Sequence, residues 1–158
     1  MLAPSVLLEA AVAKFRDVAA LVMLLSNDPD NIYLYNDQAP PSRSAEEAAS
    51  QMASPGMMVA FQGSVIVPRG GINTWQHRFA AYLRTEGVHA LSPTLGGYYD
   101  LWHAFVEGVP DGCANRLIDE PIHPDCDPIG EDVSFVRALD DGGTEHWTIV
   151  FSLNEIGG

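Results

Sequence analysis

The segment with the most obvious chemical potential is His123-Pro-Asp-Cys-Asp127, which gathers a histidine, a cysteine and two aspartates. All of these side chains can bind metal ions. Zinc sites, however, usually present paired spacings such as Cys-x2-Cys, and no second pair lies near this segment. Neighbouring residues of an extended loop also cannot all point at one ion. We therefore expect no metal and no cofactor here.

Thiol chemistry is the second possibility, because Cys113 or Cys126 could act as a nucleophile with His103 or His123 as its base. No family signature surrounds either cysteine, and the chain contains no GxSxG, Walker or GxGxxG motif. We expect no catalytic residues. A small cytoplasmic enzyme or ligand-binding domain that uses this Cys/His/Asp loop is the alternative from another class.

The cysteine count and the first residues indicate a reducing compartment. Two cysteines are too few for a disulfide framework, and Met-Leu-Ala-Pro-Ser lacks the basic region of a signal peptide. Both cysteines are therefore expected to be free thiols. No run reaches the roughly 18 apolar residues that a membrane helix needs, so no membrane partner is expected.

Acidic residues dominate the chain unevenly. The formal net charge of the 158 residues is -13, and residues 86–158 hold 14 acidic but only 2 basic side chains. Such a chain does not bind duplex DNA from outside by releasing counterions. It could line a passage through which DNA slides without sticking, or the excess charge could simply maintain solubility.

The stretch from Gly56 to Glu86 organises the rest of the chain. Two β-prone runs separated by Arg69-Gly70-Gly71 predict a pair of antiparallel strands. The first run shows no alternation, so it is expected to be buried on both faces, with a bulge or bend at Gly63. The second run alternates. One face is mostly apolar and is expected to pack on the core; it holds Trp75, His77, Phe79, Ala81 and Leu83. The other face is expected to meet water, nucleic acid or another subunit; it holds Gln76, Arg78, Ala80, Tyr82 and Arg84. His77 is interpreted as a structural histidine with its hydrogen bonds satisfied.

Elements before the central strands are predicted from periodicity and turn residues. One amphipathic helix is expected from Pro4 to about Leu25, ended by the Asn/Asp/Pro turn at 27–30. Ile32–Tyr35 is expected to be a short strand. A long polar loop follows at about 36–55, in which Ser44-Ala-Glu-Glu47 fits a capping box and predicts one or two helical turns. The loop is either a surface segment or an arm that becomes ordered against a neighbouring subunit.

After the central strands, residues 98–107 are predicted to form a second, aromatic helix, and a strand is expected near Leu117-Ile118. Residues 133–139 and 145–153 flank Asp140-Asp-Gly-Gly143, which predicts a closing hairpin. We therefore predict a single α+β domain over 1–158: a mostly antiparallel mixed sheet with the N-terminal and aromatic helices packed on it.

This order of elements resembles the tail terminator proteins of long-tailed bacteriophages, also called tail completion or minor tail protein U-like proteins. The resemblance rests on the first helix with Ile32-Tyr-Leu-Tyr35, the run Trp75–Arg84 and the terminal run Trp147–Leu153, and it spans most of the chain. The acidic residues 86–158 and the loop 120–132 do not match the family pattern.

The resemblance implies a non-enzymatic structural protein of the virion, assembled in the host cytoplasm. Six copies would form a homohexameric ring that caps the head-proximal end of the tail tube and offers a docking surface to the head-tail connector. Its partners would be itself, the tail tube protein and the connector protein, while DNA would pass through the lumen without specific binding. A head-tail connector or neck protein is the alternative within this class. The residues we expect at the subunit interface are Asn36, Gln38, Arg43, Arg69, Arg78 and Arg84.

Overall fold

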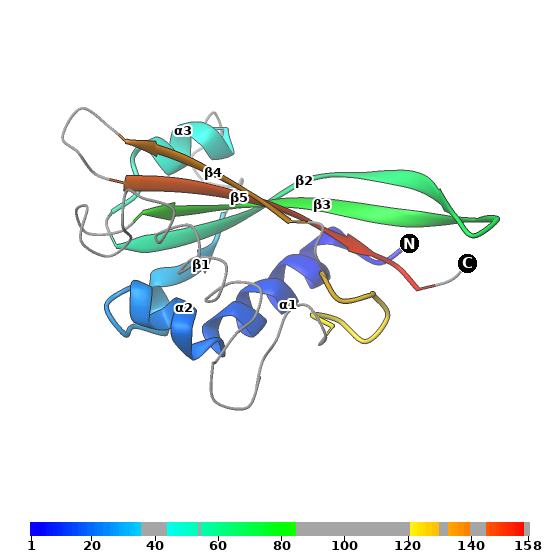
Figure 1. Cartoon of the computed structure of the whole chain (residues 1–158), viewed down its shortest axis with the longest axis horizontal. Coiled ribbons are helices and arrows are strands. Elements are labelled where there is room, and N and C mark those ends of the chain that lie inside the picture. The colour runs from blue at the N-terminus through cyan, green and yellow to red at the C-terminus, as the bar shows by residue number, and fades with distance from the viewer. Residues whose placement is uncertain (36–43, 54, 85–120, 130–132, 140–144, 157–158) are drawn as a thin grey trace.

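The computed structural model of the chain describes residues 1–35, 44–53, 55–84, 121–129, 133–139 and 145–156. Within them, five strands form one mixed sheet in the order β1-β2-β3-β5-β4 (Figure 1). β1 runs parallel to β2, and the remaining neighbours are antiparallel. The sheet with a few helices confirms the predicted α+β class. The strands are β1 (Ile32–Leu34), β2 (Gly56–Arg69), β3 (Ile72–Arg84), β4 (Val133–Leu139) and β5 (Glu145–Asn154).

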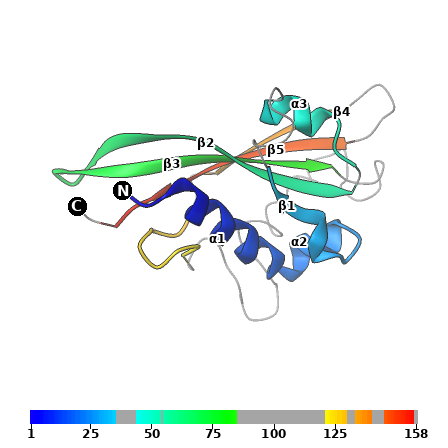
Figure 2. The ribbon, with the colours of Figure 1, turned by 180° about the vertical axis from the view of Figure 1, so that it is seen from behind.

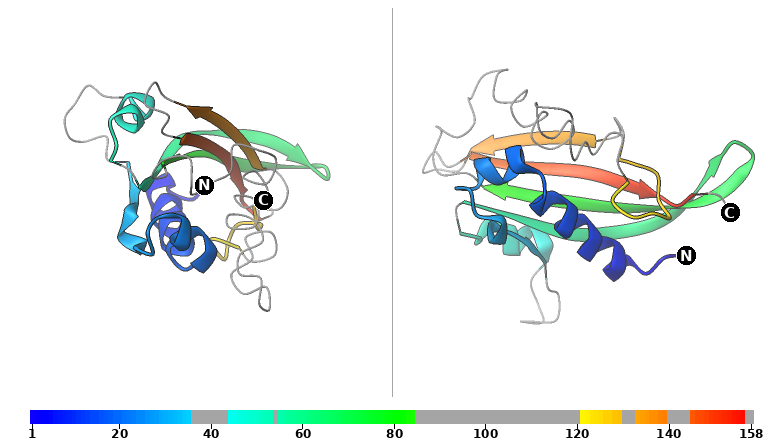
Figure 3. Two further views of the ribbon diagram at one scale, coloured as in Figure 1. Left: turned by 60° about the vertical axis from the view of Figure 1, so that its left-hand side comes forward. Right: turned by 90° about the horizontal axis from the view of Figure 1, so that it is seen from below.

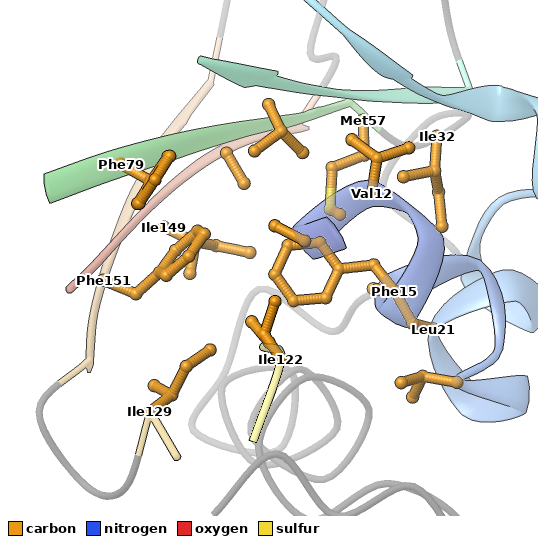
Figure 4. Close-up of a cluster of buried hydrophobic side chains, with 14 of the residues drawn as sticks. Val12, Phe15, Leu21, Ile32, Met57, Phe79, Ile122, Ile129, Ile149 and Phe151 are labelled. Atoms are coloured by element: carbon orange, nitrogen blue, oxygen red, sulfur yellow. The ribbon is translucent and has the colours of Figure 1, made fainter. Parts of the chain in front are cut away.

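One face of the sheet packs on the N-terminal helices α1 (Pro4–Arg16) and α2 (Ala19–Leu24) (Figure 3). The predicted apolar faces of the helical segment, β3 and β5 meet there and form the main core. Figure 4 shows Phe15 of α1 pointing toward Phe151 of β5, and their ring centroids are 5.5 Å apart. Loop residues Ile122 and Ile129 close the same cluster (Figure 4).

The single helix predicted to run to about Leu25 is wrong, because the chain breaks between α1 and α2. Asp17 ends α1, and Val18 has extended backbone angles of φ -84° and ψ 99°. Asp and β-branched Val both have low helix propensity, which favours a break at this pair. The break changes the chain direction, so that Val18, Leu21 and Leu25 are all fully buried.

The opposite face of the sheet is covered in part by α3 (Ala45–Ser50), which confirms the predicted helical turns. The Ser44 hydroxyl caps this helix by accepting a hydrogen bond of 3.2 Å from the Glu47 amide. Below α3 lies a second apolar cluster that includes Ala80 and Tyr82. The expectation that the polar face of β3 is open is therefore wrong for these two residues, because a helix packs on them.

The central hairpin, formed by β2 and β3, has the predicted turn and bulge. Gly70 and Gly71 connect its strands with positive φ values of 58° and 84°, which two-residue hairpin turns require. The register shifts between Phe61 and Gly63. Burial on both faces holds only for Gly56–Ala60 and is wrong from Phe61 onward, because the two apolar clusters include β2 residues only from Met57 to Ala60.

The closing strands β4 and β5 pair antiparallel as predicted, and Trp147, Ile149, Phe151 and Leu153 face the core. A short 3-10 turn, η1 (Pro29–Asn31), precedes β1. The predicted aromatic helix at 98–107, the strand near 117–118 and the connection at 140–143 lie outside the described residues. Among the described helices, none is long and apolar enough to cross a bilayer.

Candidate functional site

The candidate site is the tip of the central hairpin, Ile66–Trp75, which we call the arm. β5 pairs with β3 only from Gln76 to Arg84, so the arm strands pair only with each other among the described strands. Figures 1 and 2 show the arm projecting past the rest of the sheet. Its side chains Ile66 and Ile72 are 56% and 52% exposed. The arm therefore carries one exposed isoleucine on each of its two faces.

An ion pair joins the arm to the loop at residues 121–129. Arg69 donates a hydrogen bond of 2.6 Å to Asp127, and both side chains are about half exposed, at 47% and 39%. Exposed ion pairs of this kind contribute at most about 1 kcal/mol. A groove of about 330 Å³ lies beside the pair, between the arm and residues Asp127, Glu155 and Ile156. The arm cation is thus weakly held and can be shared with a partner.

The charge of the central hairpin is opposite to that of the rest of the chain. Residues 56–84 contain three arginines and no acidic residue. All 21 acidic residues and only five of the eight basic residues lie elsewhere. The central hairpin is therefore a positively charged segment in a chain whose formal net charge is -13.

A buried hydrogen-bond cluster lies at the base of the arm. His77 is completely buried, with its Nδ1 2.6 Å from Ser64 Oγ and its Nε2 2.8 Å from Glu155 Oε2. The other carboxylate oxygen of Glu155 accepts a hydrogen bond of 3.1 Å from the Leu2 amide. Thr74 Oγ1 donates to the Glu155 carbonyl at 3.1 Å. The cluster ties the arm to residues near both ends of the chain.

A serine, a histidine and a carboxylate in one chain of hydrogen bonds could suggest a hydrolase triad. In a triad, the nucleophile must meet its substrate in an accessible cleft. Neither the groove beside Arg69 nor the larger groove described below includes Ser64 or His77 in its lining. The cluster is better explained as a support that fixes the arm, and both ring nitrogens of His77 have hydrogen-bond partners, as predicted. Sequence reasoning missed Glu155, which is 78 positions from His77 and lies in no motif.

Replacing Glu155 with alanine is expected to lower the free energy of unfolding by about 1–3 kcal/mol, because it leaves a ring nitrogen of His77 buried without its partner. Chemical denaturation followed by circular dichroism measures this change. The exposed Glu9 on α1 is a matched control, and its replacement with alanine should change stability by about 0.5 kcal/mol or less. Equal effects of the two substitutions would contradict a supporting role for the cluster.

Of the three predicted interface arginines on the central hairpin, Arg84 lies farthest from the tip of the arm. Its guanidinium donates to the carbonyl oxygens of Ser50 and Met52, at 3.0 and 3.2 Å, and so satisfies the C-terminal end of α3. A groove of about 600 Å³ opens between α3 and the ends of β3 and β5; its lining includes Glu46, Tyr82, Arg84 and Trp147. Arg84 thus already has a structural role within the subunit.

The other predicted interface residues are distributed differently. Arg78 is exposed on the face opposite α1, and its Nε donates to Gln76 Oε1 at 3.2 Å. Arg69 is on the arm, so the three described residues of the predicted set, Arg69, Arg78 and Arg84, are spread along the central hairpin. Asn36, Gln38 and Arg43 lie outside the described residues.

The segment from His123 to Asp127 forms a turn. The Cys126 side chain is fully buried, and its backbone bridges to Glu155. Burial, followed by the nearby carboxylates, raises the pKa of the Cys126 thiol to about 11. His123 Nδ1 accepts a hydrogen bond of 3.1 Å from the Asp125 amide. Within the described ranges, no three His, Cys, Asp or Glu side chains are grouped to hold a metal ion. Cys113 and His103 lie outside them.

Cys126 is expected to resist alkylation in the folded protein. With a pKa of about 11, only about one thiol in a thousand is ionised at pH 8, and the side chain is inaccessible. Peptide mass spectrometry after iodoacetamide treatment should find the Cys126 peptide unmodified, and fully modified when guanidinium is present. Rapid modification of the native protein would indicate an activated thiol and would favour the enzyme alternative.

A scan against models of known protein families finds no match, and no curated protein matches the chain in sequence.

Proposed function

We propose that this protein is a structural subunit of a phage virion, a tail terminator whose copies form a ring at the head-proximal end of the tail tube. The observation that carries the proposal is the projecting arm of a cationic hairpin on a strongly acidic chain. In a ring, each subunit meets its neighbours through two different surfaces, head to tail. A projecting element of one charge and a body of the other supply such a pair of surfaces.

The exposed side chains of the arm and the hydrogen bonds at its base support a role in contacts between subunits. Its exposed Ile66 and Ile72 are the kind of apolar side chains that an interface buries. The His77 cluster holds the base of the arm, which reduces the ordering that association would require. The acidic remainder would repel phosphate in a lumen that DNA crosses without specific binding. The partners of such a ring would be the tail tube protein and the head-tail connector.

Electron microscopy of the purified protein tests the proposal. We expect closed rings, with six copies as the expected number, and mass photometry should give the corresponding multiple of 17.1 kDa. Adding the tail tube protein of the same phage should place the ring at one end of the tube. A twelve-fold ring that binds portal complexes would favour the neck-protein alternative. A protein that stays monomeric at high concentration would overturn the proposal.

A further inference from the structure

Glu155 is the point at which the arm, β5 and the residues before α1 meet. β5 pairs with β3 as far as Asn154, so Glu155 stands one position past the last paired residue. It still contacts the arm and its base through three groups. The Glu155 amide donates to the Trp75 carbonyl at 2.9 Å, its carbonyl accepts from Thr74 Oγ1 at 3.1 Å, and its carboxylate lies 2.8 Å from His77 Nε2. The position of the arm therefore depends on how firmly Glu155 is held.

The Glu155 carboxylate is held from two sides. Its Oε2 faces the completely buried His77, while its Oε1 accepts a hydrogen bond of 3.1 Å from the Leu2 amide. A carboxylate with a partner on each oxygen has its orientation fixed by both, and hydrogen bonds to charged groups are among the stronger ones. The Glu155 side chain is 17% exposed, so an oxygen that loses its protein donor can bond to water instead. Loss of the Leu2 donor would then let the carboxylate turn away from His77.

The residues before α1 are held by few contacts. Ala3, the N-cap of α1, makes no capping hydrogen bond with its side chain. The Leu2 side chain is partly buried at the margin of the main core, and Met1 is 70% exposed. Segments with few buried contacts open at a lower free energy than the core does. The hydrogen bond from Leu2 thus joins a segment that opens easily to a cluster that fixes the arm.

We propose that residues 1–3 act as a latch on the arm. While the Leu2 amide holds Glu155, the base of the arm is fixed; when this bond opens, the arm moves relative to the sheet. The latch is a property of the single subunit, but its consequence for assembly rests on the proposed ring function. A loose arm must be ordered again when it contacts a neighbouring subunit, so release of the latch lowers the affinity between subunits.

Replacing Leu2 with proline tests the latch, because proline has no amide hydrogen to donate. Leu2→Ala is the matched control, since it loses the same side chain but keeps the amide. All chains carry the same Gly-Ser extension before Met1, so that residue 2 keeps its peptide bond. Hydrogen exchange is followed by mass spectrometry on subunits diluted until mass photometry finds only monomers. The amides of residues 66–75 should exchange about tenfold faster in Leu2→Pro than in Leu2→Ala.

The amides of residues 147–151 in β5 show whether the change is confined to the arm. Their exchange should be the same in both variants. Unchanged exchange in the arm would overturn the latch. Equal acceleration in the arm and in residues 147–151 would also overturn it, because the substitution would then loosen the whole fold.

The same comparison in a Glu155→Ala background tests whether the latch acts through Glu155. The arm should then exchange fast with either residue at position 2, and Leu2→Pro should add less than about twofold. A tenfold effect that persists without Glu155 would overturn the proposed route.

Mass photometry of the undiluted variants connects the latch to assembly. The dissociation constant of the rings should rise about tenfold in Leu2→Pro and less than about twofold in Leu2→Ala. A faster-exchanging arm in rings of unchanged affinity would overturn the link to assembly and leave the latch standing. Monomers of the unmodified protein would overturn the ring function, and hydrogen exchange would still decide whether the latch exists.

Discussion

Shortening the arm by two residue pairs is expected to weaken assembly at least about tenfold without unfolding the subunit. The variant lacks Pro68, Arg69, Ile72 and Asn73 and keeps Gly70-Gly71 as the turn. Val67 already pairs with Thr74, two positions from the pair Arg69 and Ile72, so the turn keeps its place in the register. Loss of buried anchors such as Arg and Ile commonly weakens an interface by about 2 kcal/mol or more in total, so we expect the dissociation constant to rise at least about tenfold.

Mass photometry across a dilution series measures this loss, and circular dichroism establishes that the fold remains. The deletion leaves His77, Glu155 and Thr74 in place, so thermal unfolding of the monomer should stay close to that of the full chain. Met23→Ser is the control, because Met23 is 68% exposed on α2, away from the central hairpin. Rings of unchanged size and affinity in the shortened variant would show that the arm is not part of the interface.

Replacing Phe79 with alanine is expected to give the largest loss of stability, about 3–5 kcal/mol. Phe79 is fully buried and stacks on Phe151 with ring centroids 5.4 Å apart and an interplanar angle of 15°. Its other side meets Phe61 edge-on at 5.6 Å. The substitution would leave a cavity between β2, β3 and β5, which the surrounding backbone can only partly close. Guanidinium denaturation with two-state fitting measures the effect.

Phe61 provides the internal comparison for this substitution. It is 36% exposed and contacts the same ring from the edge of the sheet, so replacing it with alanine should destabilise the fold less than half as much. Equal destabilisation by Phe61→Ala and Phe79→Ala would contradict this difference in burial. It would mean that the apolar core includes Phe61 as fully as Phe79.

Much of the sheet could be predicted from the sequence because its signals are local. The alternation in β3 and β5, the Gly70-Gly71 turn and the Ser44 cap each depend on a few neighbouring residues. The same kind of periodic pattern led to a wrong prediction of one helix where the structure has two, α1 and α2. A continuous apolar stripe is compatible with one helix or with two, and the choice depends on where Val18 and Leu21 find space against the sheet.

The candidate site was less predictable because its contacts are distant in the sequence. The pairing of Arg69 with Asp127 and of His77 with Glu155 joins residues 58 and 78 positions apart, and no local pattern specifies either. For Arg84, a local pattern was present but led to a wrong expectation. Its alternation with apolar residues indicated a surface charge, but α3 folds back over the sheet and gives its guanidinium two carbonyl partners.

The hydrogen bond between the Leu2 amide and the Glu155 side chain places the first and last described residues of the chain together at the base of the arm (Figure 2). A short Gly/Ser linker could therefore join them, and the backbone could be reopened at another exposed site with every strand pairing preserved. Such a circular permutant would move the free termini away from the cationic hairpin. Labels or surface anchors could then be attached without obstructing the surface on which assembly is proposed to depend.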